Sequence, residues 1–385
     1  MANLVAGNTT AVRMDQIDVA NLWDGTITEQ SDTKLMVDIG GGYVEHFTGF
    51  GLTYSGLTGD PLSGTITGYQ ETLLGQPTFT VTGLNISAVD FNTWVNNDDT
   101  FGALAHMFAG NDSMTGGSFN DFMAGLDGHD ILMGGAGADT LAGNAGNDHL
   151  YGQSNLGGPD GADSILGGDG IDYLQGNAGN DTLDGGNNAD RINGGADNDL
   201  IYGGDGNDAI NGNLGNDTID GGFGSDLVRG GKGDDLIQGH DGNDTLMGDL
   251  GNDTIDGGAG NDLMTGGDGA DVFRFDRFSG SESNQFVGGG LHEDHITDYQ
   301  QGVDHIQLEF KPTAILTGTA SDDIHAVSDA RDLMIAHTGY GEVALMQVGT
   351  DTYLLSSGAG DSDFEDVWVK IDNTTAANFT FADFV

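Results

Sequence analysis

Aspartates recur at a fixed spacing through the middle of the sequence, and a carboxylate is a hard oxygen ligand. The spacing is nine residues, and it is interrupted once, between Asp148 and Asp163. The series consists of Asp112, Asp121, Asp130, Asp139, Asp148, Asp163, Asp172, Asp181, Asp190, Asp199, Asp208, Asp217, Asp226, Asp235, Asp244, Asp253, Asp262 and Asp271. The chain has no cysteine, and its histidines are not regularly spaced. This donor set favours Ca²⁺ over Zn²⁺.

Each aspartate belongs to a nine-residue unit, GGxGxDxUx, in which U is a bulky apolar residue. An apolar residue follows every aspartate of the series by two positions, from Met114 to Phe273. Glycine fills the first position in 17 of the 18 units, and the fourth position in 15. Asn188 and Asp197 replace the fourth glycine in two units, and both residue types tolerate a positive φ angle. Phe119, at the same position, has no explanation from the sequence.

The unit also predicts the elements that position the aspartates. Glycines allow turn conformations that other residues avoid, and the xUx triplet is a minimal strand with its middle side chain on one face. A turn and a short strand, repeated, wind a solenoid. If successive strands alternate between two sheets, residues 18 apart stack at a spacing of ~4.8 Å. The sequence therefore predicts an all-β fold built around a parallel β-roll with a thin apolar core.

Stacking places like charges together. Carboxylates of units that lie above one another would approach within ~5 Å, where two negative charges repel by about 3 kcal/mol at an effective dielectric constant near 20. One apolar residue per unit contributes only ~1.5–3 kcal/mol. A divalent cation between the turns, with glycine-loop carbonyls completing its oxygen shell, would remove the repulsion and stabilise the roll.

Residues 107–274 resemble the RTX (repeats-in-toxin) nonapeptide array. The resemblance implies a right-handed parallel β-roll with several Ca²⁺ ions between adjacent turns. It implies that all 18 aspartates of the series are ligands, together with loop carbonyls. The departures at the fourth position, the insertion at 152–157 and the unpaired end units predict fewer than 18 bound ions. A flexible acidic linker is the alternative, but disorder does not require an apolar residue at one fixed position.

Residues 1–106 lack the repeat and predict a small β-rich N-terminal domain. Thr, Val, Phe and Tyr are frequent there, and glycines break the segments. The predicted strands lie within 33–39, 46–57, 64–69 and 77–84. Two short helices, at 88–95 and 101–108, are expected to couple this domain to the roll.

Residues 275–385 predict a β-rich C-terminal cap. The segment 294–308 resembles the cap that follows RTX arrays in serralysin-type secreted proteins, and Asp383, Phe384 and Val385 resemble an uncleaved type I secretion signal. A hairpin is expected within 341–357, around Gly349–Asp351. The last strands are expected at 364–371 and 378–385.

The charge balance restricts the partners. Acidic residues outnumber basic ones 61 to 10, and the formal net charge is −51. Nucleic acid and anionic membranes are therefore unfavourable partners, and no apolar run predicts membrane insertion. The first residues lack the basic and apolar regions of a signal peptide. We therefore expect export through a type I ABC apparatus to the cell surface or the extracellular space.

No catalytic residue is predicted. The sequence has neither HExxH nor GxSxG, and the four residues 292–295, HEDH, have the wrong spacing for a helical zinc pair. The favoured function is a non-enzymatic, calcium-dependent extracellular structural protein that self-associates as a surface layer, filament or matrix. A calcium-dependent adhesin or polysaccharide-binding protein, with a cell-surface glycan as partner, is the alternative. An enzyme with an irregular site is the third hypothesis.

Overall fold

The structure is a computed structural model, and the described part of the chain consists of strands, turns and two short 3₁₀ helices. The described residues are 3–6, 26–31, 34–40, 43–54, 61–73, 76–87, 110–116, 120–153, 160–275, 294–308, 312–320, 342–356 and 367–385, with the backbone alone described before residue 110. The two helices predicted at 88–95 and 101–108 lie outside these residues, as does Phe119. The chain divides into two compact units, Met1–Gly186 and Asn187–Val385.

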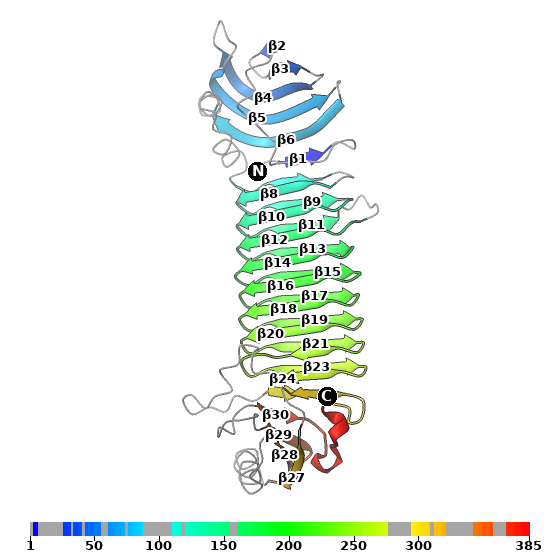
Figure 1. Ribbon diagram of the computed structural model, residues 1–385. Helices are drawn as coiled ribbons and strands as arrows, with labels where there is room; N and C mark the ends of the chain where they lie inside the picture. The colour runs from blue at the N-terminus through cyan, green and yellow to red at the C-terminus, as the bar shows by residue number, and fades with distance from the viewer. Residues whose placement is uncertain are drawn as a thin grey trace. The chain divides into compact units, whose positions relative to one another are not determined.

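The first unit begins with the strands that the sequence predicts (Figure 1). Their bounds are β1 Asn3–Ala6, β2 Thr26–Ser31, β3 Lys34–Gly40, β4 Tyr43–Tyr54, β5 Pro61–Leu73 and β6 Gln76–Ser87. They pair antiparallel in the order β2, β3, β4, β5, β6, β1. The other edge of β1 pairs in parallel with β7 (Ser113–Thr115), so β1 joins this sheet to the repeat. All four predicted strand segments overlap β3 to β6.

The repeat in the first unit forms two parallel stacks of short strands. The strands are β7 Ser113–Thr115, β8 Phe122–Asp127, β9 Ile131–Gly135, β10 Thr140–Ala145, β11 His149–Gln153, β12 Ser164–Asp169, β13 Tyr173–Ala178 and β14 Thr182–Asn187. Odd-numbered strands pair with odd, and even with even. Leu141 of β10, for example, pairs with Met123 of β8, 18 residues before it. On its other side Leu141 pairs with Ile165, 24 residues on, so the six inserted residues leave the register intact.

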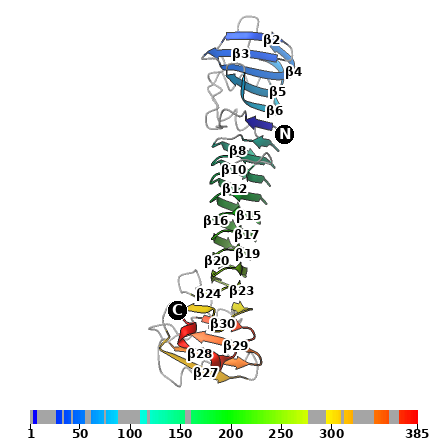
Figure 2. The same ribbon diagram turned by 90° about the vertical axis from the view of Figure 1, so that its right-hand side faces the viewer.

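The second unit has the same two-sheet pattern within itself. Its repeat strands are β15 Arg191–Ala196, β16 Leu200–Asp205, β17 Ala209–Leu214, β18 Thr218–Phe223, β19 Leu227–Lys232, β20 Leu236–Asp241, β21 Thr245–Leu250, β22 Thr254–Asp256, β23 Leu263–Asp268 and β24 Val272–Phe275. In the view of Figure 2, β16 and β20 lie on one face, and β15, β17 and β19 lie on the other. Ile219 pairs with Ile237, and that residue pairs in the same way with Ile255. The prediction of a parallel β-solenoid is confirmed.

Burial alternates along each repeat strand with a period of two. In β18 the burial runs intermediate, buried, intermediate, buried from Thr218 to Gly221. The apolar residue of the unit points inward, and Ile219, Ile237 and Ile255 are fully buried. The glycine that opens the next unit is the second inward position. The core is therefore one apolar side chain and one glycine deep per strand.

The chain beyond residue 275 closes the second unit with a mixed sheet. The elements are β25 Asp294–Ile296, β26 His305–Leu308, β27 Ala314–Thr319, β28 Glu342–Val348, β29 Asp351–Ser356, β30 Val367–Ile371, η3 Ala376–Asn378 and η4 Phe381–Asp383. β25 and β26 continue the parallel stacks of β23 and β24. β28 and β29 form the predicted hairpin, in which Val348 pairs with Asp351.

The strand predicted at 378–385 is wrong. The segment forms the 3₁₀ helices η3 and η4, and Thr380 and Asp383 form a capping box at the start of η4. The Thr380 N–H donates to Asp383 Oδ2 over 2.7 Å, and its hydroxyl accepts from the Ala382 N–H. These local bonds satisfy backbone and side-chain groups that a strand would have to pair elsewhere. One isolated bridge, between Ile306 and Phe384, is all that this segment contributes to a sheet among the described residues.

Candidate metal centre

The aspartates of the series are buried inside the turns. Their exposed fractions lie between 0% and 3%. Within each compact unit, the backbone N–H of a series aspartate donates to Oδ1 of the aspartate that stacks on its C-terminal side. Asp208 N–H donates to Asp226 Oδ1 over 2.8 Å, and Asp226 N–H donates to Asp244 Oδ1 over 2.8 Å. One carboxylate oxygen is thus fixed by the backbone of the neighbouring turn, and we call this series of contacts the aspartate ladder.

The second carboxylate oxygen, Oδ2, has a different environment. In twelve of the ladder aspartates Oδ2 is buried and accepts no hydrogen bond. These are Asp130, Asp139, Asp148, Asp163, Asp208, Asp217, Asp226, Asp235, Asp244, Asp253, Asp262 and Asp271. A buried carboxylate oxygen without a partner is costly, and its recurrence at the same position of these twelve units calls for a counter-charge.

The first glycine of each unit creates the space in front of Oδ2. A Cβ placed on Gly221 would lie 2.7 Å from Asp226 Oδ2 and 2.9 Å from the carbonyl oxygen of Gly239 in the next turn. A Cβ on Gly167 would lie 2.6 Å from Asp172 Oδ2 and 2.5 Å from the Gly185 oxygen. Calcium binds oxygen at 2.3–2.6 Å. The missing side chain therefore leaves the space between a carboxylate and a carbonyl open to a cation, and we call this gap the glycine cradle.

The fourth position of the unit keeps the turn compact. Gly224 has a φ angle of +134°, and a Cβ there would overlap the carbonyl of Gly206 in the turn below. Asn188 and Asp197 have φ angles of +76° and +75°. The prediction that these two replacements adopt a positive φ is confirmed, so the turn geometry survives both departures from glycine.

Burial strongly perturbs the ladder carboxyls. Desolvation raises the pKa of Asp226 from 3.8 to about 7, although the Asp208 N–H bond opposes the shift. Desolvation likewise raises the pKa of Asp163 to about 8, and the neighbouring Asp181 and Asp139 add to it. Without a cation these carboxyls hold protons near neutral pH. A divalent ion at the glycine cradle would take the place of those protons.

The donor set fits calcium. No group of three or more His, Cys, Asp or Glu side chains converges within the described residues. Each ladder position instead offers one carboxylate oxygen and backbone carbonyls, which are all hard oxygen donors. Ca²⁺ accepts such flexible oxygen shells, whereas Zn²⁺ prefers nitrogen and sulfur ligands.

The insertion at 152–157 does not break the ladder. Asp139 N–H donates to Asp163 Oδ1 over 2.8 Å, and Asp148 N–H donates to Asp172 Oδ1 over 2.7 Å. Both pairs are 24 residues apart instead of 18. Residues 154–159 themselves lie outside the described part of the chain.

Two further aspartates extend the ladder, and the nine-residue spacing does not reveal them. Asp262 N–H donates to Asp294 Oδ1, and Asp271 N–H donates to Asp304 Oδ1, both over 3.1 Å. Each begins a DHI triplet whose isoleucine is fully buried, which is the aspartate-x-apolar core of the unit without its glycines. That triplet is the signal that could have identified them. The other carboxylate oxygen of Asp304 accepts the Gln300 N–H over 2.6 Å.

Two further sequence features concern the HEDH segment and membrane-spanning helices. His292 and Glu293 of the HEDH segment lie outside the described residues. Across the part of the chain that the structure describes, no helix has the length and apolarity needed to cross a bilayer.

Comparison with known proteins identifies the repeat. The family model of the RTX calcium-binding nonapeptide repeat (4 copies) matches residues 108–141, 124–155, 158–192, 184–219, 220–255, 238–273 and 248–280. No curated protein matches the chain.

Similar solved structures include two subunits of one enzyme and a lipase. The AlgE6R3 subunit of the Azotobacter vinelandii mannuronan C5-epimerase is 28% identical, with a TM-score of 0.29, over 42% of this chain and 78% of that one. The AlgE6R2 subunit of that epimerase is 28% identical, with a TM-score of 0.26, over 41% and 90%. The extracellular lipase LipA from Serratia marcescens is 16% identical, with a TM-score of 0.27, over 78% and 51%. These TM-scores are too low to transfer any activity.

Proposed function

Because residues 108–280 carry an array of RTX calcium-binding nonapeptide repeats, we propose that Ca²⁺ folds this chain into an extracellular structural protein. The proposed ligands are the Oδ2 atoms of the 18 ladder aspartates and the carbonyls of the first-position glycines. Calcium supplies positive charge between turns, and the chain supplies fixed carboxylates, backbone carbonyls and gaps without side chains. Asp262 and Asp271, at the C-terminal end of the array, are included.

One observation carries this proposal. In turn after turn a buried Oδ2 without a hydrogen bond faces a glycine cradle bounded by a carbonyl oxygen. The core is thin, with one apolar side chain per strand, so the rest of the free energy of folding has to come from an ion bound at that position. A cation that binds only the folded state stabilises it by mass action.

Export follows from the same linkage. At low cytosolic calcium the repeat would stay unfolded and able to pass a type I ABC channel, and millimolar calcium outside the cell would then fold it. The proposed location is the cell surface or the extracellular space.

A structural role is favoured by the repetitive architecture. A stack of short parallel strands tied by ions is stiff, and it ends in strand edges that can pair with another chain. In the first unit the even-numbered sheet ends at β8, which pairs with β10 and with no other described strand. Self-association of these edges, or calcium bridges between acidic faces, would build a surface layer, filament or matrix.

Negative-stain imaging and light scattering test this role. The secreted protein is expected to form regular assemblies in millimolar calcium and to lose them after chelation. A protein that stays strictly monomeric in calcium would contradict the structural role, and a circular dichroism spectrum unchanged by chelation would contradict calcium-dependent folding.

A calcium-dependent adhesin or polysaccharide-binding protein is the second candidate. It is favoured by a polar groove on the second unit, between β17, β19 and β21. A glycan array, probed in calcium and in chelator, tests it independently of assembly.

A further inference from the structure

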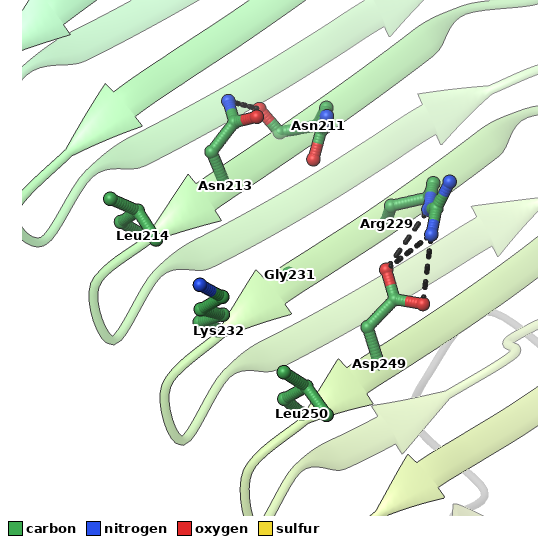
Figure 3. A pocket seen from close by; sticks show the side chains of 8 residues that line it. All are labelled: Asn211, Asn213, Leu214, Arg229, Gly231, Lys232, Asp249 and Leu250. Carbon is green, nitrogen blue, oxygen red and sulfur yellow. Dashed lines mark hydrogen bonds and ion pairs between the residues drawn. The ribbon is translucent and has the colours of Figure 1, made fainter.

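A shallow, open groove crosses three neighbouring strands of the second unit (Figure 3). Its volume is about 460 Å³. Gly231 of β19 lies at its centre, because Asn213 of β17 pairs with it on one side and Asp249 of β21 on the other. The absence of a side chain at Gly231 hollows the sheet between two polar ones.

The two flanking residues depart from the repeat. Asn213 and Asp249 occupy the second position of their units, where glycine is the consensus, and have φ angles of +76° and +73°. Asn and Asp tolerate this left-handed conformation, and second positions elsewhere in the array, such as Asn144 and Asn177, also adopt it. The chain thus places two polar side chains on this face where the consensus of the repeat has glycine.

Two of the chain's 10 basic residues, Arg229 and Lys232, line the groove. The Arg229 guanidinium forms a bidentate pair with Asp249, with Nε–Oδ2 and Nη2–Oδ1 distances of 2.9 Å. Lys232 makes no ion pair with any described residue. Lys232 lies between Leu214 and Leu250 in the strand register, and these leucines are 47% and 43% exposed.

The groove also offers amide groups. The Asn213 side-chain nitrogen donates to the Asn193 side-chain oxygen and to the Asn211 carbonyl, the latter over 3.3 Å. That use of the nitrogen leaves the Asn213 side-chain oxygen as an acceptor in the groove. An ammonium group, an amide, a planar Arg–Asp pair and two exposed leucines therefore line one surface (Figure 3).

We infer that this groove binds a sugar unit that carries a carboxylate, within an oligo- or polysaccharide. The Lys232 ammonium pairs with the carboxylate, the Asn213 oxygen and the Arg229–Asp249 pair bond to ring hydroxyls, and Leu214 and Leu250 contact the C–H face of the ring. The groove is open to solvent, so one sugar unit of a longer polymer can occupy it. This inference rests on the second candidate function and names its ligand class.

Isothermal titration of the full-length, calcium-loaded protein with trigalacturonate tests the inference, with the free calcium concentration matched in a reference titration. We expect weak binding that salt screens, and Lys232→Gln is expected to weaken it by about fivefold to tenfold. Arg191→Gln is the control, because it removes one exposed positive charge from β15, outside the groove. The methyl ester of trigalacturonate should bind as weakly to the unaltered protein as trigalacturonate binds to Lys232→Gln.

Two variants restore the consensus glycine. Asn213→Gly and Asp249→Gly remove a groove side chain where the backbone already suits glycine, so calcium-dependent folding should persist while trigalacturonate affinity falls. Equal binding by Lys232→Gln and the unaltered protein would overturn the inference and leave a glycan-binding function at another site. Equal binding of trigalacturonate and its ester would overturn the carboxylate requirement. No glycan binding on the array would remove both the inference and the second candidate function.

Discussion

Asp226 and Asp304 occupy equivalent rungs of one ladder but balance their charge in different ways. Oδ1 of each accepts the N–H of the preceding rung. Oδ2 of Asp226 is buried without a hydrogen bond and faces a glycine cradle, whereas Oδ2 of Asp304 accepts the Gln300 N–H. The difference shows that backbone N–H groups alone can satisfy both carboxylate oxygens of a ladder aspartate. We therefore expect a cation only where no N–H reaches the second oxygen.

Calcium removal is expected to have the largest effect on the stability of the ladder. Chelation at pH 8 should unfold the repeat, because many buried carboxylates then lose their counter-charge together. The hairpin of β28 and β29, whose buried residues Ala344, Met346, Tyr353 and Leu355 form an apolar cluster, should keep more of its protection. Hydrogen exchange with mass spectrometry resolves the two regions. Equal protection of the repeat in calcium and in chelator would contradict the cation requirement.

Substitution of single ladder aspartates distinguishes those whose Oδ2 lacks a hydrogen bond from those whose Oδ2 accepts a backbone N–H. Asp226→Asn should lower the free energy of unfolding by about 2 kcal/mol in calcium and by much less in chelator, because it weakens a metal ligand. Asp304→Asn should cost about 1–3 kcal/mol in both conditions, because an amide nitrogen would face the Gln300 N–H. Chemical denaturation with and without calcium measures both, at pH 5, where the metal-free repeat is expected to keep its strands. If the cost of Asp226→Asn were the same in both conditions, Asp226 would not be a calcium ligand.

A smaller effect is expected from filling one cradle. The methyl group of Gly221→Ala would enter the gap between Asp226 Oδ2 and the Gly239 carbonyl, so one site should lose calcium at a cost of about 1–3 kcal/mol. Gly302→Ala is the control, because Gly302 has a φ angle of +78° and no atom lies within 4 Å of a Cβ there. Its cost should be the same with and without calcium. The bound calcium counted by atomic emission would be unchanged in Gly221→Ala if the cradle were not a site.

The smallest effect concerns pH in chelator. Burial raises the pKa of Asp253 from 3.8 to about 7, as it does for Asp226. The metal-free folded state therefore binds protons more tightly than the unfolded state, and its stability is fullest below pH 3.8 and is lost as the pH rises to about 7. Circular dichroism in chelator should show more strand at pH 5 than at pH 8. Strand content that increases with pH would contradict the raised pKa values.

The sequence predicts the repeat well because its period states which side chain faces inward. The buried Ile219 and Ile237 and the positive φ of Asn188 follow from position in the unit alone. Asp294 and Asp304 could not be found by spacing, because the segment before them and the distance between them break the period. The strand predicted at 378–385 was wrong because apolar alternation does not reveal a local capping box.

The sequence predicts less about the hydrogen bonds of the ladder than about its spacing. A nine-residue spacing predicts that carboxylates stack, but not which oxygen the neighbouring N–H takes. That division depends on backbone direction, which residue types do not encode. The polar groove around Gly231 was likewise invisible, since it depends on residues of three strands meeting across the sheet.

The 24-residue pairing between β10 and β12 has a practical meaning. Strands on both sides of the insertion keep their partners, so the chain can accept additional residues at this point. A peptide epitope or a small domain grafted there would be displayed at a known height along the stack, without altering the pitch of the solenoid on either side.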